Sequence, residues 1–178
     1  MHFGAPTKPM PLRSEQIILF RIGTQVFALS SSSVQEVRSA DSLTGGAEEI
    51  SAPGVGKVRQ FLRRGDHTLF IVSGAEHFGV SAAEGVLAFV LRNTRAALLV
   101  DGIERMTEMT RLQALPLSFC HEERQWYRGL TALDQAVIPV VRPEGVLSTE
   151  DLLSLDAALP PADEVSGEQD IEGTELTQ

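Results

Sequence analysis

The chain has 178 residues and a mass of 19.3 kDa, and 43% of its residues are hydrophobic, which predicts one globular domain or two small subdomains. Its formal net charge of −9 argues against a nucleic-acid backbone as the main partner. A single cysteine, Cys120, excludes an intrachain disulfide and fits a cytoplasmic location. No apolar run approaches the roughly 18 residues that a membrane-spanning helix needs.

The two ends of the chain differ in composition from the middle. Residues 1–14 contain three prolines and lack the apolar stretch of a signal peptide. Residues 159–178 contain six acidic residues and no basic one, so residues 1–158 carry 15 basic and 18 acidic residues, or −3. We expect a disordered leader over 1–14 and a disordered acidic tail over 159–178, either a solubilising end or an electrostatic interaction segment.

Between these ends the sequence is built of short apolar runs separated by turn residues, a pattern typical of a β-sandwich or β-barrel. Helices are expected to be scarce. Ser148 can cap a helix over 149–156, where three leucines give an apolar face, whereas residues 33–40 and 111–115 are ambiguous. The predicted strands cover residues 17–22, 26–29, 34–37, 67–72, 85–91, 96–100 and 136–141.

A weak internal repeat relates positions that are about 69 residues apart. It aligns Phe20 with Phe89, Ile22 with Leu91, Leu29 with Leu98, Val34 with Ile103 and Val37 with Met106. A second pairing, at an offset of 64, aligns Arg64-Gly65 with Arg128-Gly129, and an apolar strand follows each. Two matches in the same order predict two similar β subdomains, over about 15–83 and 84–147, with the boundary near 81–85.

Residues that carry catalysis form no recognisable constellation in the sequence. Cys120 and His121 are the only adjacent thiol and imidazole, and neither His67 nor His77 has a partner at metal-ligand spacing. The run 30–33 of four serines lacks the glycines of a nucleophile elbow. The default interpretation is therefore a protein-binding module without enzyme activity, cofactor or metal.

The order of these segments resembles the CheW-like family, the coupling proteins of bacterial chemotaxis, over about residues 16–156. No single motif carries the resemblance; it rests on an ordered set of pieces with the family's spacing. These pieces are Phe20-Arg21-Ile22-Gly23 with Phe27-Ala28-Leu29, Val34-Gln35-Glu36-Val37, Arg64-Gly65 before an apolar strand, Leu98 to Ile103, Leu115-Pro116, Tyr127-Arg128-Gly129 and Val137 to Leu147.

The resemblance implies an all-β fold of two small five-stranded β-barrel subdomains that share an apolar interface, followed by a short C-terminal helix. It also implies a cytoplasmic, non-enzymatic adaptor of a two-component system that needs no cofactor. Such an adaptor couples the tips of chemoreceptor hairpins to the regulatory domain of a CheA-type histidine kinase. Neither nucleic-acid binding nor direct membrane insertion is part of that role.

Seven residues form the predicted partner-binding site. A helical receptor hairpin needs an apolar groove, and Val34, Val37, Val100 and Ile103 lie on repeat-related segments that could line the gap between the barrels. Ordinary core packing is the alternative for each of these four. The resemblance places Glu36, Arg64 and Gly65 near partner contacts, where the two opposite charges could pair with each other or across an interface.

The chain departs from the family pattern just after Arg64-Gly65. Leu69, Val72 and Ser73 stand where the family usually has proline, aspartate and leucine, and residues 39–57 form a glycine-rich loop. In the family this first subdomain carries the kinase contact. An alternative is therefore a divergent CheW-like protein of another signalling or motility pathway that binds receptors without activating the kinase. A second alternative is a small hydrolase or ligand-binding domain that uses Cys120 and His121.

Overall fold

The computed structural model describes residues 13–83 and 85–162, so the predicted leader up to residue 12 and the tail from residue 163 lie outside it. In the described residues the chain forms eleven β-strands and four α-helices. The strands are β1 (Glu15–Ile22), β2 (Gln25–Ser30), β3 (Val34–Ser39), β4 (Glu48–Glu49), β5 (Val58–Arg64), β6 (His67–Ser73), β7 (Leu87–Leu91), β8 (Ala96–Val100), β9 (Gly102–Met109), β10 (Tyr127–Leu133) and β11 (Ala136–Val141). The helices are α1 (Ala40–Thr44), α2 (Gly74–Phe78), α3 (His121–Trp126) and α4 (Thr149–Ala158).

All seven predicted strands are present, and the predicted C-terminal helix is confirmed as α4. The hydroxyl of Ser148 accepts a hydrogen bond from the backbone N–H of Asp151 at 3.0 Å, as expected of a helix cap. The strands β5, β9 and β10 were not predicted, because they carry charged residues and are only partly buried. Each of the three lies at or next to the edge of a sheet, where one face or side meets solvent.

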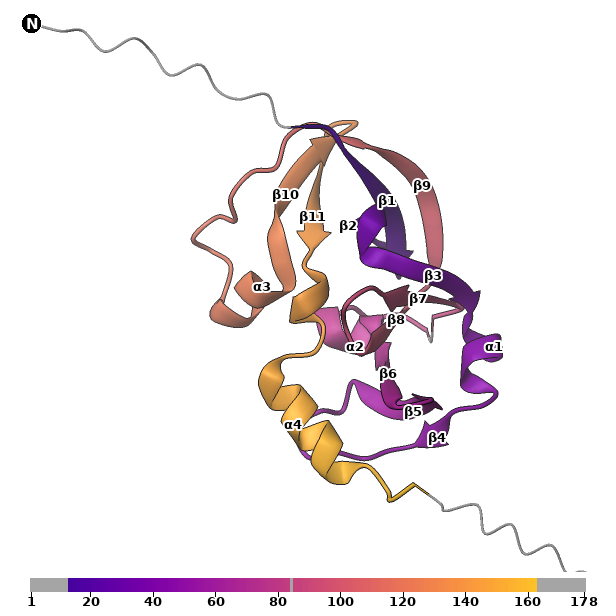
Figure 1. The fold of residues 1–178 in the computed structure, drawn as a ribbon. Helices are drawn as coiled ribbons and strands as arrows, with labels where there is room; N and C mark the ends of the chain where they lie inside the picture. Colours follow the sequence, from indigo (N-terminus) through magenta and orange to yellow (C-terminus); the bar gives the residue numbers. More distant parts are fainter. Residues whose placement is uncertain (1–12, 84, 163–178) are drawn as a thin grey trace, which may run out of the picture.

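The strands form two sheets, which occupy the upper and lower halves of the molecule in Figure 1. Sheet A has the order β10-β11-β2-β1-β9, and sheet B has the order β3-β7-β8-β6-β5-β4. The main core lies between them and includes Phe20 and Phe27 from sheet A with Phe70 and Phe89 from sheet B. Because each sheet also covers a smaller core on its other face, a strand such as β8 is buried along its whole length.

The expectation of two five-stranded barrels is not confirmed. Sheet B has six strands, and within the described residues neither sheet closes its ladder into a barrel. Sheet A comes near to closure through an isolated bridge between Gln113, after β9, and Leu130 of β10. The hydroxyl of Thr131 supports this bridge by donating to the carbonyl of Arg111 at 2.8 Å. The fold is therefore mostly β, with two curled sheets and short helices.

The internal repeat is visible in the pairing of the strands. Adding 69 to the bounds of β5 gives those of β10, and the irregularity between Val58 and Gln60 recurs between Tyr127 and Gly129. The parallel pair of Ile71 with Ala97 recurs, at the same offset, as the pair of Val140 with Ala28. Thus β3, β5 and β6 correspond to β9, β10 and β11, and β7 and β8 correspond to β1 and β2.

The corresponding strands are exchanged between the sheets. Sheet A combines β1 and β2 with β9, β10 and β11, whereas sheet B combines β3, β5 and β6 with β7 and β8. Each sheet therefore contains strands from both sides of the predicted boundary near 81–85. That boundary separates the two repeats, and it does not separate the two sheets.

Three of the predicted alignments are corrected by the strand pairing. The loop between β1 and β2 is two residues shorter than that between β7 and β8, so the counterparts of Phe89 and Leu91 are Ile18 and Phe20 and not Phe20 and Ile22. The offset of 64 is wrong, because Arg64 ends β5 at its hairpin turn whereas Arg128 lies at the opposite end of β10. Arg128 instead donates from both terminal nitrogens to Glu15 of β1, at 2.9 and 3.2 Å.

Candidate functional site

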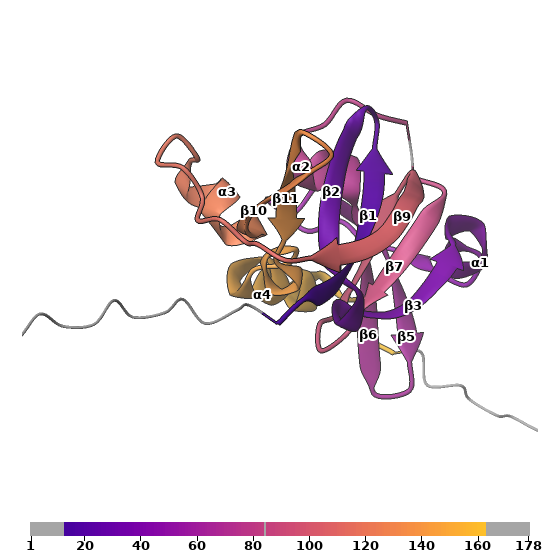
Figure 2. The ribbon, with the colours of Figure 1, turned by 90° about the horizontal axis from the view of Figure 1, so that it is seen from above.

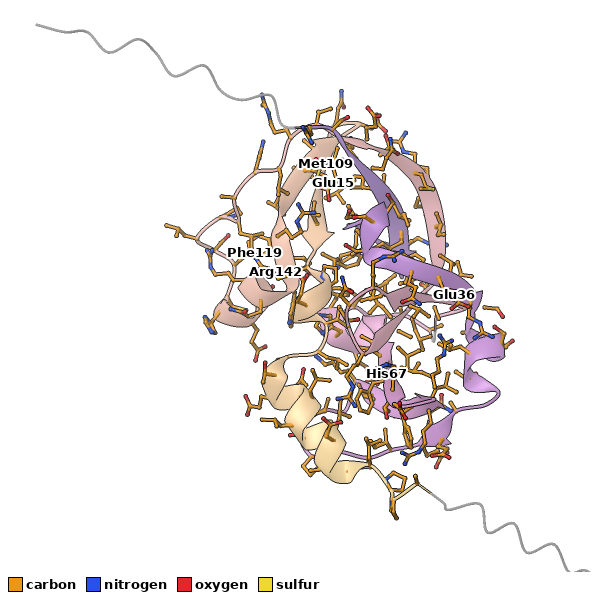
Figure 3. All side chains as sticks on the ribbon, in the orientation of Figure 1. Glu15, Glu36, His67, Met109, Phe119 and Arg142 are labelled. Carbon is orange, nitrogen blue, oxygen red and sulfur yellow. The ribbon has the colours of Figure 1, made fainter. Side chains whose placement is uncertain are left out.

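The structure brings Glu36 and Arg64 together from opposite sides of sheet B. Glu36 lies on the edge strand β3, and β7, β8 and β6 separate it from β5, which Arg64 ends. Because the sheet curls, Glu36 Oε2 lies 3.6 Å from Arg64 Nη1, and Glu36 Oε1 lies 3.4 Å from Arg38 Nε. Figure 3 labels Glu36 on β3, together with His67, which pairs with Arg64 across the hairpin.

This ion pair is partly open to solvent and contributes little to stability. The Glu36 and Arg64 side chains are 41% and 37% exposed, so solvent screens their attraction. A pair of this kind contributes at most about 1 kcal/mol to folding. Both groups keep enough free surface to meet a charged partner, where complementary charge sets orientation and selectivity.

Gly65 gives the hairpin the backbone conformation that places Arg64. Its φ is +57°, in the left-handed region that glycine adopts without a steric penalty. A Cβ added to Gly65 would meet nothing within 4 Å, so the requirement comes from the backbone and not from crowding. The structure thus gives Gly65 a turn role, and it leaves the surface beside Arg64 open.

The four predicted apolar residues differ in how far their side chains are exposed. Val37 and Ile103 are 43% and 42% exposed, on the edge strands β3 and β9, whereas Val34 is half-buried against the main core. Val100 is fully buried within β8, so its role is packing and a partner cannot reach it. For Val100 the alternative of core packing is therefore the correct one.

Met106 is an exposed apolar residue that the predicted site omits. Its side chain is 61% exposed on β9, and it occupies the position that corresponds to Val37 in the repeat. The signal was present, since the repeat aligned the two residues, but exposure cannot be read from such an alignment. Large exposed apolar side chains on edge strands are typical of protein contact surfaces.

The start of β9 is fixed against the turn between β1 and β2. The backbone N–H of Gly23 donates to Asp101 Oδ2 at 2.6 Å, and the N–H of Asp101 donates to the carbonyl of Arg21 at 2.8 Å. Arg21 Nη1 also lies 3.5 Å from Glu104 Oε1. These contacts hold Ile103 in place at the corner where the two sheets meet.

Cys120 and His121 lie at the start of α3. Cys120 precedes α3, and its N–H donates to Glu123 Oε2 at 2.8 Å, which stabilises the first turn of that helix. Residues 13–83 and 85–162 contain no group of three or more His, Cys, Asp or Glu arranged to hold a metal ion. In the same residues, no helix is both long and apolar enough to cross a bilayer.

His77 is a buried histidine in α2, beside Trp126 of α3. Its Nδ1 accepts a hydrogen bond from Lys57 Nζ at 3.1 Å, and its ring lies 5.0 Å from that of Trp126. Burial, with a further contribution from the Lys57 ammonium, lowers the pKa of His77 to about 3. The imidazole is therefore neutral at physiological pH and serves to anchor Lys57, which also pairs with Asp151 of α4 at 3.0 Å.

Comparison with known proteins identifies the family. The crystal structure of the scaffolding protein TtCheW from Thermoanaerobacter tengcongensis matches with a TM-score of 0.59 and 12% sequence identity, over 73% of this chain and 90% of that chain. At this identity the likeness shows a shared fold. No curated protein matches the chain. The family model described as the CheW-like domain matches residues 16–151, which is most of the chain, and the chain therefore belongs to the CheW-like family.

Proposed function

We propose that this protein is a cytoplasmic, non-enzymatic adaptor that couples the tips of chemoreceptors to the regulatory domain of a CheA-type histidine kinase. Membership of the CheW-like family supports a scaffolding role in chemotaxis signalling. The observation that carries the proposal is the partly exposed pair of Glu36 and Arg64, joined at 3.6 Å across the curl of sheet B.

The kinase contact is assigned to the surface formed by Glu36, Arg64 and Gly65. The two charges neutralise each other when the surface is free, so exposing them costs little. A partner with charges in the matching arrangement can engage both groups at once, and a partner with the reverse arrangement is rejected. Selectivity of this kind suits an adaptor that must distinguish one regulatory domain from others.

The receptor contact is assigned to the exposed edge strands, with Val37 and Ile103 as anchors and Met106 as an addition from the structure. A receptor hairpin is helical, and a helix binds through apolar side chains that fit a hydrophobic surface. Val37 and Met106 occupy corresponding positions in the two repeats. The two sheets thus present equivalent apolar positions on β3 and β9.

Titration calorimetry against the CheA regulatory domain of the same organism tests the kinase contact. We expect low-micromolar binding, on the order of −8 kcal/mol. Glu36→Arg and Arg64→Glu should each weaken it at least about tenfold, because each places like charges together at the interface. The melting temperature should stay nearly unchanged, because the native pair contributes little to folding.

Arg21→Glu provides a matched control. Arg21 and Glu104 form an ion pair of nearly the same length, 3.5 Å, and nearly the same exposure, 45% and 44%, on sheet A. Its reversal should leave kinase binding intact. Arg21→Glu changes the net charge by the same amount and sign as Arg64→Glu, so equal weakening by these two variants would show a general effect of net charge and would remove the assignment to Arg64.

The alternative of a CheW-like protein that binds receptors without the kinase is favoured by the changes in β6. Val72 is fully buried where the family usually has aspartate, and the hydroxyl of Ser73 caps α2 by accepting from the N–H of Glu76 at 3.3 Å. An apolar residue fits the buried position of Val72, and a hydroxyl fits the cap position of Ser73. Both departures from the family pattern are therefore compatible with this fold. Receptor binding by a folded chain that does not bind the kinase domain would establish this alternative.

A further inference from the structure

The β5–β6 hairpin carries Arg64 at its turn. Arg95, the residue just before β8, contacts the β6 strand of this hairpin. Arg95 Nε donates to the carbonyl of Thr68 in β6 at 3.3 Å, and its guanidinium lies 4.9 Å from the centre of the Phe70 ring. The two terminal nitrogens of Arg95 donate to both carboxylate oxygens of Asp156 in α4, at 2.9 and 2.7 Å. A two-pronged bond of this kind fixes the direction of the guanidinium as well as its position.

Arg95 extends the sheet beyond the end of its ladder. The parallel pairing of β6 with β8 begins at Phe70 and Ala96, and the N–H of Phe70 donates to the carbonyl of Arg95 at 2.8 Å. The Thr68 carbonyl lies two residues nearer the hairpin turn than Phe70. It accepts its hydrogen bond from the side chain of Arg95. Thr68 pairs across the hairpin with Arg63, the residue beside Arg64, so the support ends one residue from the proposed contact.

Asp156 is in a position that helix stability alone does not explain. It lies in the last turn of α4, where the negative end of the helix dipole disfavours a carboxylate. Hydrogen bonding to Arg95 lowers its pKa, so the carboxylate is kept charged for that contact. Just beyond the helix, the carbonyl of Pro160 accepts a hydrogen bond from Arg63 of β5. The end of α4 thus holds both strands of the hairpin.

We infer that Arg95 and Asp156 are positioning residues that fix the β5–β6 hairpin, and through it Arg64, for partner binding. The inference rests on the proposed role of Arg64 in the kinase contact. Figure 2 shows why support is needed, since the hairpin projects beyond β3 and β7 at the lower edge of the view. When Asp156 of α4 holds Arg95, the hairpin presents Arg64 in one geometry. Without this ion pair the hairpin samples several conformations, and binding becomes weaker.

A double-mutant cycle measured by calorimetry with the CheA regulatory domain tests this inference. Asp156→Asn should weaken binding about fivefold, the scale expected for one partly exposed ion pair. In a chain that carries Arg64→Ala, the same substitution should change the affinity little, because its effect passes through Arg64. Asp156→Glu, which keeps the charge, should restore most of the affinity.

Asp151→Asn is the matched control for the helix itself. It breaks the other ion pair of α4, with Lys57 at 3.0 Å, at the opposite end of the helix from the hairpin support. We expect it to lower the melting temperature at least as much as Asp156→Asn while leaving kinase binding unchanged. Equal losses of binding in both variants, or an Asp156→Asn effect that persists with Arg64→Ala, would overturn the inference.

Hydrogen exchange of the free protein separates this inference from the proposed function. If the unmodified chain does not bind the kinase domain, the proposed function fails. The exchange rates of the amides from Arg64 to Thr68 then decide whether the hairpin is held. Faster exchange in Asp156→Asn than in Asp151→Asn supports the positioning role, and equal exchange contradicts it.

Discussion

The hairpins β5–β6 and β10–β11 have the same backbone pairing and opposite surface chemistry. In the first, Glu36 of the edge strand meets Arg64 at the turn, and Arg95 supports the other side. In the second, the counterpart of Glu36 is Arg105, which pairs with Asp134 at the turn, so the polarity is reversed. The counterpart of Arg95 is Val26, and the counterpart of Thr68 is the exposed Val137.

This contrast shows which features the fold requires and which are free to vary. Both hairpins retain the same irregular pairing and the alternation that fills the cores, because packing depends on them. Their outer surfaces differ. Beside β10–β11 the surface is hollowed by about 430 Å³ and lined in part by Leu19, Val26 and Val137. The proposed charged contact therefore belongs to one repeat and is not a general property of the fold.

The largest expected effect comes from separating the two repeats. Residues 1–83 and 84–178, produced as separate chains, should each fail to fold, because each sheet takes strands from both. Mixed together, the two fragments should regain the circular dichroism and the cooperative melting of the intact protein. Cooperative folding of either fragment alone would contradict the exchanged topology and would indicate that one repeat is sufficient.

A smaller effect on stability is expected from the protonation of His77. Its counterpart in the other repeat is Val146, which is fully buried. The folded-state pKa of His77 is lowered to about 3, so below pH 6.5 the unfolded chain binds a proton that the folded chain does not. Stability should therefore fall as the pH falls, by about 3 kcal/mol between pH 7 and pH 4 from this group. Urea denaturation across this range measures the loss.

His77→Val is the informative variant, because it places in one repeat the residue that the other repeat has. Its stability should depend less steeply on pH between 4 and 7 than that of the unmodified chain. An unchanged slope would mean that other groups, such as the carboxylates paired with arginine, account for acid sensitivity. Lys57 loses its acceptor in this variant, so the comparison is made on the slope and not on the stability at pH 7.

The smallest effect concerns the two turns. Gly65 has φ +57°, and in the other hairpin Asp134 and Gln135 have φ +48° and +66°. Gly65→Ala should destabilise the protein by about 1 kcal/mol, whereas Gln135→Gly should stabilise it by up to about 1 kcal/mol, because only glycine avoids the left-handed penalty. Chemical denaturation of both variants should show opposite signs; the same sign would mean that turn strain is not what distinguishes these hairpins.

Much of the fold could be predicted from the sequence, because buried strands leave long apolar runs. The strands from Ile17, from His67 and from Ala96 were found in this way, and the order of motifs identified the family. The sequence did not reveal the strand exchange, since a repeat shows which segments are alike and not which ones pair. β9 was missed because the charged residues of this edge strand hide its period.

The candidate site was predictable only in part. Glu36 and Arg64 were found through family resemblance, and their contact depends on a curl of sheet B that no local pattern encodes. Val100 was assigned to the site because its apolar character could be read, whereas its burial could not. Arg95 and Asp156 are 61 residues apart, and no local pattern singled out either of them.

The exchanged strands also determine when the molecule can fold during synthesis. β2 ends at Ser30, but its neighbour β11 ends at Val141, so 111 further residues must be translated before sheet A is complete. At about 5 to 20 residues per second this takes about 6 to 22 s. Throughout that interval β2 can pair only with β1, and its other edge is unpaired. A chaperone that shields the nascent chain should therefore increase the yield of folded protein.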